Sequence, residues 1–209
     1  IEVRITRPFD IGATEVTQLQ WEAVMGTRPW EGRAWAQNDH HAPATYVSWH
    51  DAAEFCARLS AAGEAEYALP AEAQWLLACY AGREDGDLWW FAQEDATDFA
   101  WLRPNTEGAG ESWPHTVGTL APNDFGIHDM PGNVLEWTAD AYDWWTWRPE
   151  RSEPVKVDPA LPPDGDGLRV ICGGSLYYTP RQLLIYPTRE RYATRRTFDT
   201  GFRVIRTIP

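Results

Sequence analysis

Two carboxylates flank a tight turn near the middle of the chain. Asp129 and Glu136 lie on either side of Pro131-Gly132, within a stretch, residues 123–137, that turn-forming residues keep from being one continuous helix or strand. Carboxylate and carbonyl oxygens that converge from an irregular loop are the ligands that calcium prefers. An ordinary tight turn with two solvated acids explains the same spacing, so the residues alone leave both interpretations open.

The sequence predicts no cysteine-based or phosphate-binding chemistry. Cys56, Cys79 and Cys172 are widely spaced and form no C-x-x-C pair. Cys56 and Cys79 fall on apolar faces of predicted helices, which indicates buried thiols in a reducing, cytoplasmic setting. The sequence contains no glycine-rich phosphate loop and no G-x-S-x-G nucleophile motif.

Composition narrows the class of partner. The 209-residue chain has a formal net charge of −13 and is 44% hydrophobic, which suits one compact domain. The acidic excess argues against nucleic acid and anionic membrane surfaces, because both need a basic footprint. No apolar run is long enough to span a bilayer and no signal peptide is visible, so we expect no membrane insertion and a cytoplasmic location.

Three helices are predicted in the N-terminal part of the chain. Thr17 with Gln20, and Ser48 with Asp51, have the spacing of a capping box, and a glycine follows each predicted helix. A third helix is predicted to open at Pro70, a favourable first-turn residue.

Helical periodicity disappears over residues 83–170. Only short strand-like runs, such as residues 115–118, interrupt this stretch. Long irregular segments in a compact domain are usually functional or stabilised by an ion.

Several short motifs resemble those of the formylglycine-generating-enzyme (sulfatase-modifying factor) family, and they follow one another in the order of that family. They are residues 15–18 (EVTQ), 43–52 (PATYVSWHDA), 67–75 (YALPAEAQW), 123–137 (NDFGIHDMPGNVLEW), 173–175 (GGS) and 201–204 (GFRV). The resemblance implies an α+β fold of the C-type-lectin-like kind, with residues 1–209 forming a single domain.

The residues that hold copper in that family are not matched here. The family binds copper through two cysteines that follow the Gly-Gly-Ser turn. Tyr178 and Leu183 stand at the matching positions, and Cys172 precedes the turn. Because soft Cu(I) needs soft thiolates, the resemblance implies no copper site, and we assign no catalytic residue.

The resemblance also implies a ligand set for calcium. In the family the ion is held by a side chain at the position of Asp129, by the carbonyls of Gly132 and Val134, and by the carboxylate of Glu136. The family member compared has Asn at the first position, and an acid there should strengthen a calcium site. Structural calcium is therefore the expected cofactor.

The C-terminal region, residues 173–203, resembles the variable region of proteins diversified by retroelements, which use the same lectin-like fold. Framework residues such as Gly174, Phe202 and Arg203 alternate there with residues atypical of the family. We predict a surface that binds a protein or a small-molecule ligand through Leu176, Tyr177, Tyr178, Thr179, Leu184, Ile185, Tyr186, Tyr192, Thr194 and Phe198.

Two alternatives explain the same departures from the family pattern. One is ordinary drift in a non-catalytic relative that binds some other ligand. The second is an oxidase or maturation enzyme like the formylglycine-generating enzymes, with an unrecognised substrate and no copper cysteine pair.

Overall fold

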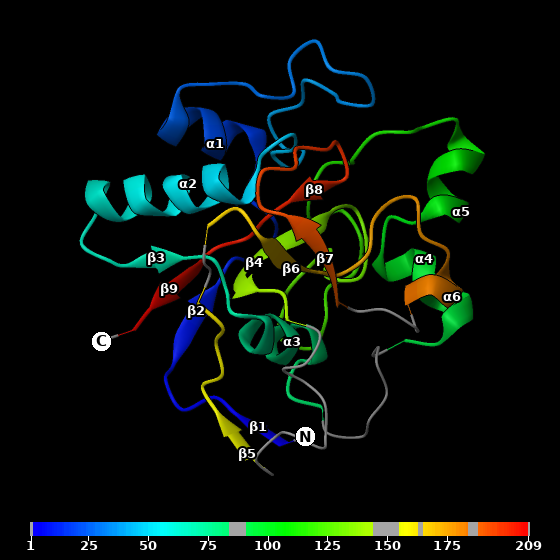
Figure 1. The fold of residues 1–209 in the computed structure, drawn as a ribbon. Helices are drawn as coiled ribbons and strands as arrows, with labels where there is room; N and C mark the ends of the chain where they lie inside the picture. The colour runs from blue at the N-terminus through cyan, green and yellow to red at the C-terminus, as the bar shows by residue number, and fades with distance from the viewer. Residues whose placement is uncertain (1, 84–90, 144–154, 163–164, 184–187, 209) are drawn as a thin grey trace.

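The computed structural model describes residues 2–83, 91–143, 155–162, 165–183 and 188–208. These residues form one mixed α+β domain built around two small sheets (Figure 1). The fold class predicted from the motifs is confirmed. No helix in these ranges is long and apolar enough to cross a membrane.

Four strands form the main sheet: β4 (Leu135–Ala141), β6 (Leu168–Cys172), β7 (Thr188–Tyr192) and β8 (Thr200–Gly201). Their order is β7-β6-β4-β8, with β4 antiparallel to β6 and parallel to β8. The first four residues of β4 are all buried, so both faces of this strand are covered. Glu136 therefore points into the protein from a rigid central strand.

The other strands are short: β1 (Glu2–Arg4), β2 (Phe9–Ile11), β3 (Tyr67–Ala68), β5 (Val155–Val157) and β9 (Ile205–Thr207). The C-terminal strand β9 lies between β2 and β3 in the second sheet, antiparallel to both. β1 and β5 form a separate parallel pair.

The two predicted capping boxes are both present. They open α1 (Gln18–Met25) and α2 (Trp49–Ala62), where Thr17 and Ser48 each accept a hydrogen bond from the backbone of the third helical residue. The glycine after α1, Gly26, takes the left-handed conformation (φ 69°) that ends a helix most easily.

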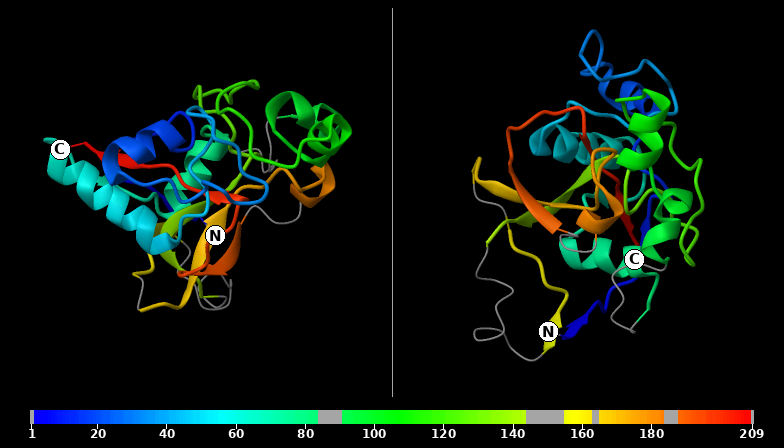
Figure 2. Two further views of the ribbon diagram at one scale, coloured as in Figure 1. Left: turned by 90° about the horizontal axis from the view of Figure 1, so that it is seen from above. Right: turned by 90° about the vertical axis from the view of Figure 1, so that its right-hand side faces the viewer.

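The third helix, α3 (Glu72–Tyr80), begins two residues after the predicted Pro70. Part of the stretch predicted to be irregular is also helical. Its short helices are η1 (Gln93–Asp95), α4 (Ala96–Phe99), α5 (Arg103–Thr106) and η2 (Glu107–Ala109), and α6 (Pro180–Leu183) follows later in the chain. α1 and α2 lie on one side of the main sheet, and α4, α5 and α6 lie on the other (Figures 1 and 2).

The strand-like run at residues 115–118 is not a strand, so this prediction was wrong. Its backbone amides bond to the loops around it: Val117 N donates to the His41 carbonyl (2.9 Å) and Gly118 N to the Asp129 carboxylate (2.6 Å). Tertiary partners therefore replace a β-ladder here.

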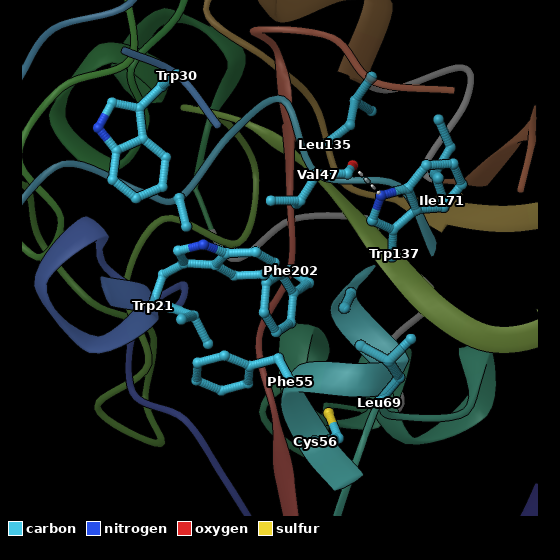
Figure 3. Close-up of a cluster of buried hydrophobic side chains, with 13 residues drawn as sticks. Trp21, Trp30, Val47, Phe55, Cys56, Leu69, Leu135, Trp137, Ile171 and Phe202 are labelled. Atoms are coloured by element: carbon cyan, nitrogen blue, oxygen red, sulfur yellow. Dashed lines mark hydrogen bonds between the residues drawn. The ribbon is translucent and has the colours of Figure 1, made fainter. Parts of the chain in front are cut away.

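Two hydrophobic clusters form the core. In the first, Trp21 stacks on Phe55 with ring centroids 5.7 Å apart, and Phe202 packs edge-on against Phe55 at 5.3 Å. Trp137 lies in the same cluster and donates its indole N–H to the Val47 carbonyl (3.0 Å), as Figure 3 shows. A buried tryptophan is stabilised in this way because its one polar atom has a partner.

The second cluster is built around Trp75 and contains Cys79 and Cys172. All three cysteines are buried and unpaired with one another, as expected for Cys56 and Cys79. Burial raises the pKa of Cys56 to about 12, so this thiol stays protonated and unreactive. Tyr178 packs against both clusters and so joins them.

Candidate functional site

A buried ion pair lies beneath the Pro131-Gly132 turn. Glu136, on β4, accepts two hydrogen bonds from the Arg203 guanidinium, at 2.7 Å from Nε and 2.6 Å from Nη2. The Trp75 indole donates a third to the same carboxylate (2.7 Å). Arg203 Nη1 donates to the Gly12 carbonyl (2.9 Å), so the pair connects the two sheets.

Two left-handed residues shape the loop above this pair. Asp129 and Asn133 have φ of 61° and 60°, a conformation that Asp and Asn tolerate better than most residues. Asn133 accepts a hydrogen bond from His115 N (2.9 Å) and donates one to Glu15 Oε1 (3.1 Å). Gly132 lies so close to the Trp101 carbonyl that an added Cβ would come within 2.6 Å of it. The shape of this loop therefore depends on the Asn133 hydrogen bonds and on the absence of a side chain at Gly132.

The cluster contains more carboxyl groups than its one guanidinium can pair with. Glu15, Asp129 and Glu136 are all buried around Arg203. Glu15 Oε2 and Asp129 Oδ1 have no hydrogen-bond partner among the described residues. Burial, reinforced by the neighbouring carboxylates, raises the pKa of Glu15 well above its ordinary value, and burial also raises the pKa of Asp129. These two side chains are poised to hold a proton or a cation.

Of the predicted calcium ligands, Glu136 is the one that this arrangement leaves least available. Both carboxylate oxygens of Glu136 are bound to Arg203, and a calcium ion would have to compete with a guanidinium for them. Asp129 fits better, because its Oδ1 is unpartnered. The described residues contain no group of three or more His, Cys, Asp or Glu side chains placed to hold a metal. Calcium binding, with Gly132 and Val134 supplying carbonyls, stays a prediction.

The positions that match the family's copper cysteines lie against one turn. An alanine Cβ at Gly174 would overlap the Leu183 side chain and the Pro131 carbonyl, and would touch the Tyr178 ring at 3.4 Å. Leu183 is buried, and the Arg189 guanidinium lies 4.6 Å from the centroid of the Tyr178 ring. The space that the family's copper site would occupy is therefore filled by the Leu183 side chain and by the Tyr178 ring, against which the Arg189 guanidinium packs.

The structure divides the predicted ligand-binding residues into groups. Leu176 is 1% exposed and belongs to the interior, so its assignment to the binding surface was wrong. Its backbone explains this, because Leu176 N donates to the Asn133 carbonyl (3.0 Å) and its own carbonyl accepts from Thr106 (3.1 Å). Leu184, Ile185 and Tyr186 lie outside the described residues.

The other six are half-buried or exposed. Tyr192 and Thr194 are exposed, and Tyr177, Tyr178, Thr179 and Phe198 are half-buried. The Tyr177 and Phe198 rings meet at right angles with centroids 5.3 Å apart. The predicted framework residues Gly174, Phe202 and Arg203 are buried.

A second segment contributes to this surface, the one around Trp35, and sequence analysis did not identify it. Trp35 is 55% exposed and its ring centroid lies 5.5 Å from that of Phe198. Tyr46 fixes the segment from below, since its hydroxyl donates to the Ala34 carbonyl (2.5 Å) and its backbone N–H to the Thr197 carbonyl (3.0 Å). The available signal was a large aromatic residue in an otherwise polar stretch.

Comparison with known proteins agrees with this fold. A family model described as "Sulfatase-modifying factor enzyme 1-like domain" matches residues 2–208. A formylglycine-generating enzyme from Thermomonospora curvata is 31% identical over 167 residues, which is 74% of this chain and 50% of that enzyme. The chain thus spans half the length of this curated relative.

Two solved structures share the fold over nearly the whole chain. Treponema denticola variable protein 1 superposes with a TM-score of 0.81 at 23% identity, covering 99% of this chain and 86% of its own. PvdO from Pseudomonas aeruginosa superposes with a TM-score of 0.77 at 24% identity, covering 99% and 83%. At these identities the likeness shows the fold alone.

Proposed function

The chain belongs to the family of sulfatase-modifying factor enzyme 1-like domains, and we propose that it is a non-catalytic binding domain within this family. It keeps the family scaffold and uses the C-terminal surface, residues 173–203, to hold a protein or a small-molecule ligand. The position of one family copper cysteine is filled by buried Leu183, which leaves the scaffold without the thiolate pair.

One observation carries this proposal: exposed side chains alternate along the C-terminal region with a buried framework. Tyr192 and Thr194 are exposed, while Phe202 and Arg203 are fully buried. Changes at exposed positions usually shift stability by less than about 0.5 kcal/mol, whereas core positions respond to small changes in volume. A surface built in this way can change its contacts without losing its fold.

We propose further that residues 173–203 are diversified by a retroelement. The likeness to a protein named as a variable protein supports this, as does the alternation of framework and atypical residues. The flanking DNA tests it. We expect a near-copy of codons 173–203 that differs only where the copy has adenine, beside a reverse transcriptase gene. Absence of such a copy from the complete genome would rule out diversification by a retroelement, and the protein would then be a binding domain without it.

Binding itself can be tested without knowing the natural ligand. The immobilised protein is panned against a phage-displayed random peptide library, and the selected peptides are assayed on the combined variant Tyr192→Ala/Thr194→Ala/Phe198→Ala. We expect binding to be lost with little change in the melting temperature. The control is Leu19→Ala/Leu77→Ala, which removes two exposed apolar side chains elsewhere (47% and 37% exposed). Selected peptides that bind all three proteins equally would contradict the proposal.

A maturation or oxidase activity is the alternative that the family relationship favours. The observation behind it is the 31% identity to a formylglycine-generating enzyme over three quarters of this chain. The buried cysteines and the filled Leu183 position count against a copper-dependent version of that activity.

A further inference from the structure

Four aromatic side chains gather on the C-terminal surface, and we refer to Trp35, Tyr46, Tyr177 and Phe198 as the aromatic patch. Phe198 contacts two of the others: its ring centroid lies 5.5 Å from that of Trp35 and 5.3 Å from that of Tyr177. Tyr46 joins through the backbone bond from its N–H to the Thr197 carbonyl (3.0 Å). The patch combines a loop from the N-terminal third of the chain with two segments from the C-terminal region.

Two members of the aromatic patch have left-handed backbones. Trp35 has φ of 56° and Tyr46 has φ of 57°, a region that bulky residues rarely occupy. The Tyr46 conformation is held by hydrogen bonds to Ala34 and Thr197. Trp35 is instead 55% exposed, so the fold accepts a strained backbone and still leaves a large apolar ring in water. Such combinations cluster at sites that bind something.

The charge of this region is opposite to that of the rest of the protein. Residues 173–203 contain six arginines and two acidic residues, a net charge of +4, in a chain whose total is −13. Three of these arginines are neutralised within the fold, through the pairs Arg191–Asp199, Arg196–Asp51 and Arg203–Glu136.

Two cations beside the aromatic patch have no such neutralisation. Arg195 is exposed, two residues before Thr197 in the loop that bonds to Tyr46, and Arg33 is exposed with its guanidinium 5.7 Å from the Tyr46 ring centroid. Within the described ranges, neither has a carboxylate oxygen within 4.0 Å. The patch therefore has the Arg33 guanidinium near one of its rings, and the exposed Arg195 lies in the same loop as Phe198.

We propose that the aromatic patch, with Arg33 and Arg195, is the docking surface for an acidic segment of a protein partner that also carries an apolar side chain. This rests on the proposed function and specifies the chemistry of its ligand. Tyr, Trp and Arg dominate the energetically important positions of protein interfaces, because they offer wide contact with few rotors to freeze. The arginines would select the acidic partner and speed its encounter.

The charge distribution favours a short acidic segment over a nucleic acid. Outside residues 173–203 the chain carries a net charge of −17, which follows from +4 in that region and −13 in total. A polyanion binds along an extended basic footprint and would meet this acidic surround. An acidic peptide with a few charges needs only a small basic site, which Arg33 and Arg195 can provide.

The test uses peptides selected on the full chain from a phage-displayed random dodecapeptide library, with Kd measured by fluorescence anisotropy. We expect Asp and Glu to be enriched in the selected peptides, together with an aromatic or aliphatic residue. Trp35→Ala and Arg195→Glu should each weaken binding by about tenfold or more. Binding to the unmodified protein should also weaken as sodium chloride is raised.

Two matched controls stand away from the aromatic patch. Phe125→Ala removes a ring that is as exposed as Trp35 (58%) and lies beside residues 5–9. Arg4→Glu reverses an exposed charge on β1, at the opposite end of the molecule in Figure 1. Both should leave Kd unchanged. A thermal melt of each variant shows that it is folded.

The outcomes separate this proposal from the proposed function. Peptides without acidic enrichment, failure to recover any peptide, or binding unaffected by Arg195→Glu would each overturn the acidic-partner proposal. If such non-acidic peptides still lose binding on Tyr192→Ala/Thr194→Ala/Phe198→Ala, the proposed function stands alone. Binding that no surface variant alters overturns both. A single-stranded oligonucleotide that competes with the peptides and depends on Trp35 and Arg195 would overturn the choice of a protein partner.

Discussion

Three carboxylates, those of Glu15, Asp129 and Glu136, lie around the single guanidinium of Arg203 in the interior. Glu136 is fully paired, at 2.6 and 2.7 Å, and the other two each keep one unpartnered oxygen. A buried charge without a partner is costly, so such groups take up a proton or a cation instead. Proton and cation are expected to compete for the same two side chains.

Replacement of Glu15 by Gln should change how stability depends on pH. Between the ordinary Glu pKa of 4.5 and its raised value in the fold, only the folded protein keeps the proton on Glu15. The folded state then binds more protons than the unfolded state, so the free energy of unfolding falls as pH rises through this window. Glu15→Gln should remove that fall and stabilise the protein near neutral pH by on the order of 1 kcal/mol.

Urea unfolding in EDTA across this pH range measures the effect. Glu64→Gln, a change at an exposed acid, is the control and should follow the unmodified protein. If the free energy of unfolding depends on pH in the same way for Glu15→Gln and for the unmodified protein, Glu15 has the same pKa in the folded and unfolded states, and the prediction is wrong.

Calcium should raise the melting temperature, and chelation should lower it. An ion that binds only the folded state stabilises it by mass action, and here it would also give the unpartnered carboxyl oxygens a partner. Because Asp129 has a free oxygen, Asp129→Asn should reduce the calcium-induced shift, while Asp124→Asn at an exposed acid should not. Scanning calorimetry with calcium and with EDTA measures this. Identical melting curves in both conditions would rule the calcium site out.

At the scale of elements, the turn at Gly174 joins the end of β6 to the surface segment that follows. Its Cα lies against Leu183 and the Pro131 carbonyl, where a side chain has no room. The turn at Gly174 therefore packs directly between the Pro131-Gly132 turn and α6. A change here should act on stability and on the whole C-terminal surface together.

Gly174→Ala should destabilise the protein by about 1–3 kcal/mol, the usual cost of overpacking, because the Pro131 carbonyl is backbone and cannot rotate away. Gly63→Ala is the control, since the nearest atom to an added Cβ there is the Leu59 carbonyl at 3.7 Å. Chemical denaturation compares the two variants. A loss of less than about 0.5 kcal/mol for Gly174→Ala would mean that the turn can relax.

Patterns of residues close together in the sequence predicted some features of the structure correctly and missed others. The capping boxes at Thr17 and Ser48 were predicted correctly because their partners lie three residues away. The Arg203–Glu136 pair joins residues 67 positions apart, and no pattern in a single sequence indicates such a contact. Leu176 was misassigned because an apolar residue after a turn looks alike whether it faces solvent or the interior.

At the scale of the whole molecule, the family fold is retained while the residues at its copper positions are changed. Tyr178 packs against both hydrophobic clusters, and Leu183 belongs to the second of them. Restoring a metal site would therefore remove core packing as well as introduce two thiols. We therefore expect this chain to keep the family fold without the copper-dependent chemistry.

The purified protein, given copper and a cysteine-containing sulfatase peptide, should form no formylglycine. The reason is that Tyr178 and Leu183 provide no thiolate for Cu(I). Mass spectrometry of the peptide detects the conversion, and the Thermomonospora curvata enzyme serves as the positive control. Copper-dependent aldehyde in the test sample would establish an oxidase that works without the cysteine pair.

The position of β9 also determines the order in which the protein can fold. β9 lies between β2 and β3, and β8 pairs with β4, so neither sheet is complete until residues 200–207 arrive. Contacts between segments this far apart close large loops, which makes folding slow compared with a helical bundle of similar size. During synthesis the capped helices α1 and α2 emerge early, and their apolar faces stay exposed until the C-terminal strands are made. We expect a chaperone to bind the nascent chain most strongly in this period.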